Sequence, residues 1–294
     1  MRRAIIRFVA SLEDSQKYHV FIAVIVALCI VAICIGIYVD KYYKYSEIDP
    51  LMMGIRIGNK KSAEEIVTLK ASFNELFSND VKSTADEDSE EYNFERINES
   101  LGSIVYNAYD LQQDTDFYNV DADIPQLNIN AENAKKINQE IYETYYKTAY
   151  IKMRNIEGMT VYNVKFAAFV NNTYLSLVIK STLKEDSKPE KVMIKTYNYN
   201  MATDSLFTIE DLIKLKNETN ESIQDTITKE IQTSDANAKI LAKEYGALYT
   251  RNLESEIYKV KNTENFFLTQ DGYVYIVYAY GNTDDTNEMD IVIF

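Results

Sequence analysis

The amino-acid sequence predicts an α+β domain with an antiparallel sheet and segregated helices, preceded by one transmembrane helix. Three observations support this prediction. Residues 20–39 form an uninterrupted apolar run, several later runs alternate apolar and polar residues across short turns, and other stretches place apolar residues three and four positions apart. We expect this organisation: 1–19, short cytoplasmic tail; 20–39, transmembrane helix; 40–78, juxtamembrane segment; 79–92, acidic linker; 93–294, extracytoplasmic α+β domain.

The predicted transmembrane helix reads VFIAVIVALCIVAICIGIYV and carries no charge. Twenty residues are enough to cross the roughly 30 Å hydrocarbon core, so we expect contact with membrane lipid here. The chain continues as DKYYKYSE without a small-residue cleavage site, which favours a retained anchor over a signal peptide. Arg2, Arg3, Arg7 and Lys17 precede the helix and favour a cytoplasmic N-terminus, which places the C-terminal domain outside the cell membrane.

Residues 60–78 have apolar side chains at near-helical spacing, which predicts a juxtamembrane amphipathic helix. The apolar positions are Ala63, Ile66, Val67, Phe73, Leu76 and Phe77. This helix either packs against its own domain or mediates self-association between neighbouring copies. The following NDVKSTADEDSEE loses the apolar pattern, and we interpret it as a flexible acidic linker and a domain boundary.

The main domain is predicted to begin with strands at 104–111 and 116–124. The second strand alternates, with Tyr118, Val120, Ala122 and Ile124 on one face, and we expect Pro125 to end it. A helix is predicted over about 131–150, where the apolar residues Ala134, Ile137, Ile141, Tyr145 and Ala149 recur at helical spacing.

Two runs of β-forming residues at 161–170 and 174–183 flank a short asparagine-containing link and predict a hairpin, followed by a strand at 191–200. Thr208 and Asp211 resemble a helix capping box. We expect further helices at 221–232 and 236–249. Strands are predicted at 266–269, at 273–280 after the turn QDG, and at the C-terminus after an acidic loop at 281–288.

Charge and composition limit the classes of function. The net charge is −14, and residues 1–44 are basic, so the remainder is more acidic than the whole chain. Such a domain repels nucleic acid and favours a cationic partner, although acidity also keeps a surface soluble. Cys29, Cys34 and His19 lie in or beside the apolar run, so the domain lacks the residues for cysteine or serine–histidine nucleophiles and ordinary zinc sites.

We therefore predict no catalytic, cofactor-binding or metal-binding residue, no cofactor and no enzymatic activity. Paired carboxylates, as in glycosidases, remain as an alternative. The close pairs Asp121/Asp123 and Asp284/Asp285 are also expected by chance in so acidic a chain.

Tyrosines are concentrated in two elements, the helix at 131–150 and the strand at 273–280. They are Tyr142, Tyr145, Tyr146 and Tyr150 in the first and Tyr273, Tyr275, Tyr278 and Tyr280 in the second. Tyrosine is favoured at binding interfaces because its ring is rigid and carries a polar hydroxyl. The two interpretations are a binding surface and a tyrosine-rich core.

Three segments resemble the ectodomain of bacterial lysozyme-sensing anti-sigma factors, and a related domain of unknown function found beside peptidoglycan deacetylases. They are VDADIPQLNINAENAKKINQEI, KTYNYNMATDSLFTIEDLI and FFLTQDGYVYIVYAY, within about residues 115–294. The resemblance implies an exported, non-catalytic α+β domain of a Gram-positive-type cell envelope, with a protein ligand such as cationic lysozyme.

The leading hypothesis is a membrane-anchored extracytoplasmic binding or sensing module that engages a protein or cell-wall ligand. An anti-sigma-factor-like signal transducer is the first alternative. A cell-wall-modifying enzyme is the second.

Overall fold

The computed structural model describes residues 55, 57–58, 61–78, 94–154, 158–246 and 249–294, which belong to one compact unit, Gly54–Phe294. The predicted cytoplasmic tail, the transmembrane helix and the whole acidic linker at 79–92 lie outside the described residues. Among the described residues, each helix is too short or too polar to cross a membrane.

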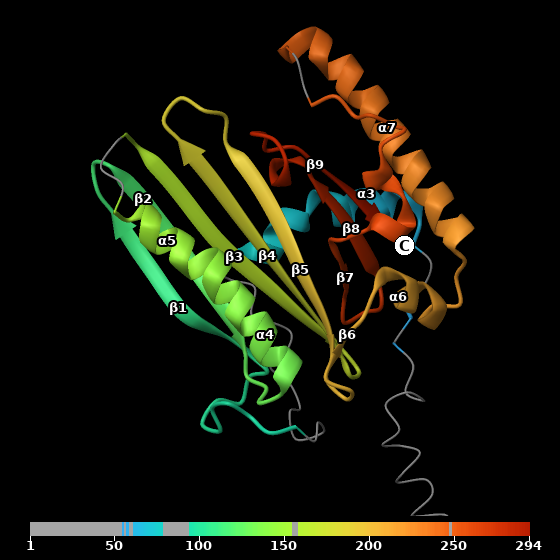
Figure 1. Ribbon diagram of the computed structural model, residues 1–294. Helices are drawn as coiled ribbons and strands as arrows, with labels where there is room; N and C mark the ends of the chain where they lie inside the picture. The colour runs from blue at the N-terminus through green and yellow to red at the C-terminus, as the bar shows by residue number, and fades with distance from the viewer. Residues whose placement is uncertain (1–54, 56, 59–60, 79–93, 155–157, 247–248) are drawn as a thin grey trace, which may run out of the picture. The chain divides into compact units, whose positions relative to one another are not determined.

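The larger of two sheets has six strands in the order β1-β2-β3-β4-β5-β6 (Figure 1). The strands are β1 (Val105–Asp114), β2 (Tyr118–Leu127), β3 (Thr160–Asn171), β4 (Tyr174–Glu185), β5 (Lys191–Asn200) and β6 (Ser205–Leu206). The α+β class is confirmed, but the expectation of a purely antiparallel sheet is wrong because β2 and β3 are parallel. A helical connection joins these two strands and returns the chain to the end where β2 began, so both run in the same direction.

Pro125 does not end β2, which continues to Leu127. The proline lies opposite Asn107, where the register shifts between Asn107 and Tyr109. Pairing of β2 with β3 reaches only to Ala122. Proline lacks an N–H group. The loss is tolerated here because Pro125 lies beside a bulge and past the residues of β2 that pair with β3.

One continuous helical segment covers one face of the large sheet (Figure 1). It consists of α4 (Glu132–Ile141), a π-helical turn (Tyr142–Tyr146) and α5 (Lys147–Lys152). The predicted apolar stripe is confirmed: Ala134, Ile137, Ile141, Tyr145 and Ala149 are all buried in one core with the facing residues of β2, β3 and β4. This burial fixes which side of the helix faces solvent.

The second sheet consists of β7 (Phe266–Leu268), β8 (Val274–Ala279) and β9 (Met289–Ile293), and it packs on the other face of the large sheet. Helices α6 (Ile209–Leu215) and α7 (Asn220–Tyr245) share a core with its far face. The capping box of Thr208 and Asp211 is confirmed at the start of α6. The two helices expected after it form the single helix α7, which buries Ile223, Ile227 and Ile231.

Buried polar side chains join the two sheets. Asn198 Nδ2 donates to the Phe266 carbonyl at 2.8 Å, and Thr196 Oγ1 accepts from the Phe266 N–H at 3.2 Å. Ser176 Oγ accepts from the Leu268 N–H at 3.0 Å and donates to Asn198 Oδ1 at 2.7 Å. These contacts satisfy backbone groups of β7 that would otherwise be buried without partners.

The segment at 60–78 packs against its own domain, the first of the two alternatives that its sequence left open. A short helix, α3 (Ala63–Ala71), leads into a 3-10 turn at Phe73–Phe77, and both phenylalanines are buried in the core between the sheets. The ring of Phe73 lies 6.3 Å from that of Phe267, centre to centre. Burial of these rings brings the segment into the same compact unit as residues 94–294.

Candidate functional site

The tyrosines of the C-terminal hairpin belong to the core. Tyr275, Tyr278 and Tyr280 are buried, and the hydroxyl groups of Tyr280 and Tyr258 lie 2.9 Å apart. Burial raises the pKa of Tyr275 to about 12, since the phenolate would lose its hydration. For these residues the structure supports the core interpretation.

The tyrosines of the helix are divided between two environments. Tyr145 points into the core and is 4% exposed, whereas Tyr150 is 43% exposed and Tyr142 and Tyr146 are half-buried. The Tyr142 and Tyr146 rings stack at 4.8 Å with 14° between their planes, and Tyr146 and Tyr150 follow at 6.4 Å and 8°. Tyr109 of β1 lies 4.7 Å from Tyr146 and 5.6 Å from Tyr142. We call Tyr109, Tyr142, Tyr146 and Tyr150 the tyrosine surface.

The π-helical turn coincides with this surface, since it spans Tyr142–Tyr146. Side chains four positions apart share one side of a helix, so Tyr142, Tyr146 and Tyr150 form one row. Single π turns are uncommon and occur frequently at functional sites. The unusual backbone and the stacked rings are therefore two independent features of the same place.

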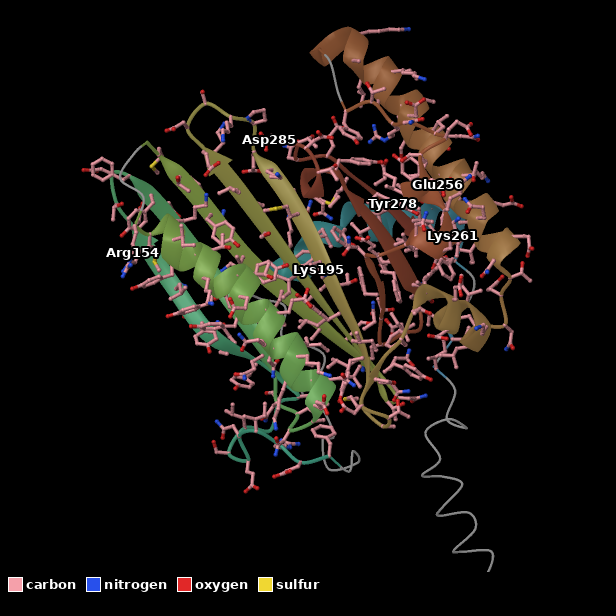
Figure 2. All side chains as sticks on the ribbon, viewed as in Figure 1. Arg154, Lys195, Glu256, Lys261, Tyr278 and Asp285 are labelled. Atoms are coloured by element: carbon pink, nitrogen blue, oxygen red, sulfur yellow. The ribbon has the colours of Figure 1, made fainter. Side chains whose placement is uncertain are left out.

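Two cationic side chains lie over the rings at the solvent side. The Arg154 guanidinium is 4.1 Å from the Tyr150 ring centre and donates to its hydroxyl, and Lys147 Nζ is 5.9 Å from the centre of Tyr142. Lys147 also pairs with Glu143. Arg154 follows the end of α5 (Figure 2). Cation–π contacts of this kind restrain ring orientation, so the surface is ordered before any ligand arrives.

The predicted carboxylate pair Asp121/Asp123 lies on the opposite face of the sheet. Lys165 Nζ is 2.9 Å from Asp121 Oδ1 and 2.7 Å from Asp123 Oδ2. Burial of the ammonium acts to lower the Lys165 pKa, but the hydrogen bonds to Asp123 and Asp121 outweigh it and the pKa is raised. The two carboxylates thus share a cation, which is an arrangement of a structural ion-pair cluster and not of a proton donor beside a nucleophile.

The other pair, Asp284/Asp285, lies in the loop before β9, where Asp285 Oδ1 is 3.6 Å from Lys191 Nζ. Across the described ranges, His, Cys, Asp and Glu residues form no group of three or more that could hold a metal ion.

A cleft of about 580 Å³ lies between residues 256–265 and the end of β8. Glu256, Lys261 and Tyr278 are three of the residues that line it (Figure 2). Two of its amide side chains already have structural partners: Asn265 Oδ1 accepts from the Thr196 N–H, and Asn282 bonds to both backbone groups of Ile194. The cleft therefore has fewer free recognition groups than its lining suggests, and the tyrosine surface is the better candidate.

Sequence reasoning singled out three of the four residues of the tyrosine surface but missed Tyr109. Tyr109 lies in the predicted strand at 104–111, outside the two tyrosine-rich elements. Nothing in its own segment indicates that it contacts the helix. Sequence reasoning placed Tyr145 both in the apolar stripe with Ile141 and Ala149 and in the tyrosine group, and the structure buries Tyr145 in the stripe.

No family model matches this sequence, and no curated protein matches it. Among solved structures, the chain is similar to a DUF3298 family protein from Pseudomonas aeruginosa PAO1, with a TM-score of 0.35 and 12% identity. That match covers 55% of this chain and 72% of the other. A member of the DUF3298 family from Bacteroides fragilis NCTC 9343 matches with a TM-score of 0.29 and 13% identity, over 54% and 74%. The chain thus has a distant structural similarity to DUF3298 family proteins.

Proposed function

We propose that this chain is a membrane-anchored extracytoplasmic binding or sensing module, without chemistry of its own, that holds a protein ligand on the tyrosine surface. The observation that carries the proposal is the row of stacked tyrosines on the solvent side of the helical segment, joined by Tyr109 from the edge of the sheet. Large rigid rings with polar hydroxyls supply contact area at low entropic cost.

The helix is attached to the sheet mainly by residues other than these tyrosines. The stripe from Ala134 to Ala149 already buries the opposite side of the helix, including the Tyr145 ring. Tyr146 packs in part against the margin of this core, whereas Tyr142 and Tyr150 add apolar area outside it, where polar residues would keep the surface more soluble. A selected contact with another molecule accounts for that placement.

Charge supports a cationic protein as the ligand class. The chain carries −14 overall, and Asp110 and Asp114 are exposed on β1, the strand that also carries Tyr109. Attraction between opposite charges accelerates the encounter of two proteins, and salt screens this attraction beyond about 8 Å at physiological ionic strength. The apolar run at 20–39 supports the membrane anchor, and the resemblance to anti-sigma-factor ectodomains supports an envelope location and lysozyme as a ligand to test.

The experiment measures association of lysozyme and other basic proteins with the full chain in detergent, at low and high salt. We expect the double variant Tyr142→Ala/Tyr146→Ala to weaken binding by at least about tenfold, because buried aromatic contacts dominate interface energies. The matched control is Leu206→Ala plus Ile240→Ala, which removes exposed apolar side chains elsewhere. Equal affinity of both double variants would contradict the assignment, and association rates indifferent to salt would show that the acidity serves solubility alone.

A further inference from the structure

We propose that the free edge of β1 receives an extended cationic peptide segment as an additional strand of the large sheet. This inference rests on the proposed function, since it specifies the form in which a protein ligand would reach the tyrosine surface. The recognised segment would alternate apolar or aromatic residues with lysine or arginine.

Strand β1 forms one edge of the large sheet. It is ten residues long and pairs with β2 on one side. In the part of the chain that the structure describes, no strand pairs with its other side. An edge strand presents alternate N–H and C=O groups outward, and extended peptides bind such edges by completing the ladder.

The two faces of β1 differ, since one carries an aromatic ring and the other carries carboxylates. Tyr109 stands opposite Ile124 on the helix-covered face, and its ring contacts the tyrosine surface. Asp110 stands opposite Asp123 on the other face. Because side chains alternate along a strand, Asp110, Gln112 and Asp114 share that second face. An added strand would therefore meet aromatic rings with one set of side chains and carboxylates with the other.

Within the described part of the chain, the negative charges of Asp110 and Asp114 are not neutralised by a neighbouring cation. Asp110 and Asp123 face each other across two strands, and like charges in that position are destabilising. Lys165 is shared between Asp121 and Asp123. No Lys or Arg of the described ranges forms an ion pair with Asp110 or Asp114. A cationic side chain on an added strand would lie next to these two carboxylates and relieve the repulsion.

The same charges disfavour a second copy of this chain as the occupant. Edge-to-edge pairing of two β1 strands would bring Asp110 and Asp114 of both copies onto the shared seam. Acidic residues on edge strands discourage such self-pairing in many proteins. A cationic partner does not meet this penalty, so charge complementarity selects it.

The probe is a fluorescent ten-residue peptide of alternating Lys and Leu, mixed with the full chain in detergent. We expect it to bind, and to bind at least about tenfold more tightly than a peptide of the same composition arranged in blocks. The variant Asp110→Asn/Asp114→Asn should weaken binding about tenfold, whereas Asp271→Asn/Glu210→Asn, at exposed acids elsewhere, should leave it unchanged.

Two further peptides carry N-methyl groups on every Lys or on every Leu. One of them should lose binding, because only one set of N–H groups can face β1. Equal binding of both would overturn strand addition, and a dimer of the chain that Asp110→Asn strengthens would assign the edge to self-pairing instead. If Tyr142→Ala/Tyr146→Ala abolishes binding of a basic protein while both methylated peptides bind equally, the proposed function stands and this inference fails. If one methylated peptide loses binding but the tyrosine variant has no effect on a basic protein, strand addition at β1 stands and the assignment of the tyrosine surface as the protein-binding site fails.

Discussion

A buried ion pair shows how single residues connect the C-terminal elements. The Arg251 guanidinium is bidentate to Asp290, with Nε at 2.6 Å from Oδ2 and Nη2 at 2.9 Å from Oδ1, and both side chains are 6% exposed. Tyr280 donates a hydrogen bond to the same carboxylate, and its ring stacks on Tyr249 at 4.0 Å. Burial acts to lower the Arg251 pKa, but the bonds to Asp290 raise it above its usual value. The pair therefore ties the chain after α7 to β9.

Replacing Asp290 by Asn should lower the free energy of unfolding by about 1.5–3 kcal/mol, because the buried guanidinium would lose its bidentate partner and keep only one carboxylate contact, that of its Nη2 with Glu288 Oε2 at 3.3 Å. Denaturant unfolding of the full chain measures this value. Glu256→Gln provides the control, since its pair with Lys261 is exposed at 69% and 68% and exposed pairs contribute less than about 1 kcal/mol. Similar midpoints for the two variants would show that the buried pair is not stabilising.

The buried tyrosines predict a loss of stability at alkaline pH. Burial raises the pKa of Tyr275 to about 12 and those of Tyr162 and Tyr278 above their ordinary value. An unfolded tyrosine ionises near pH 10, so above that pH the unfolded chain releases protons that the folded chain retains. The free energy of unfolding should be unaffected by these groups below about pH 9 and fall as pH rises through 10 toward 12.

Denaturant midpoints between pH 8 and 11, with tyrosinate absorbance recorded in parallel, check this expectation. Tyr275→Phe should make the decline shallower, because that ring no longer titrates. Ionisation of all tyrosines well before unfolding would contradict burial of these hydroxyls.

At the scale of elements, periodicity and local propensity predicted most strands and helices. The strand at 191–200 has the predicted bounds, and the hairpin and the helix after residue 131 agree within a few residues. The segment at 63–77 was assigned correctly as helical, but its partner was not evident from its own pattern. Only the positions of Phe267 and Tyr275 in the folded sheet show that Phe73 completes their core.

Phe73→Ala should therefore destabilise the domain by about 3–5 kcal/mol, the usual cost of truncating a buried ring. Val67→Ala, six residues earlier and 66% exposed, is the matched control and should change stability by less than about 0.5 kcal/mol. Unfolding of the chain that starts at Gly54 measures both. The segment would not be part of the core if the two variants were equally stable. The same would follow if a chain that starts at residue 93 were as stable as the chain that starts at Gly54.

At the scale of the whole molecule, the compact unit Gly54–Phe294 consists of four layers. They are the α4–α5 segment, the six-stranded sheet, the three-stranded sheet and the α6–α7 pair (Figure 1). The helical segment covers one face of the large sheet, and the three-stranded sheet covers the other face at β3, β4 and β5. On that other face β1 and β2 carry polar residues such as Asp110 and Asp123. The order of the layers places the proposed binding surface on the outermost helical layer and the outermost strand.

The proposed topology is testable on intact cells. If residues 20–39 anchor the chain with the N-terminus inside, protease added to protoplasts should remove the C-terminal domain, because basic flanks are retained on the cytoplasmic side. An intact cytoplasmic marker protein serves as the control for cell integrity. Protection of residues 93–294 until the cells are lysed would contradict this orientation.

The sequence by itself determined most of the secondary elements, the buried stripe of the helix and the absence of histidine and cysteine from the domain, because each is a local or compositional property. Periodicity also separates Tyr145 from Tyr142 and Tyr146, although composition alone groups them together. Tertiary structure decided the remaining features. It made β2 and β3 parallel, buried Tyr275, Tyr278 and Tyr280 between layers, and placed Lys165 between Asp121 and Asp123. It also brought Tyr109 beside Tyr142 and Tyr146, which are more than thirty residues away in the chain. These features depend on which elements become neighbours, and that choice is set by the packing of whole faces, which no single segment encodes.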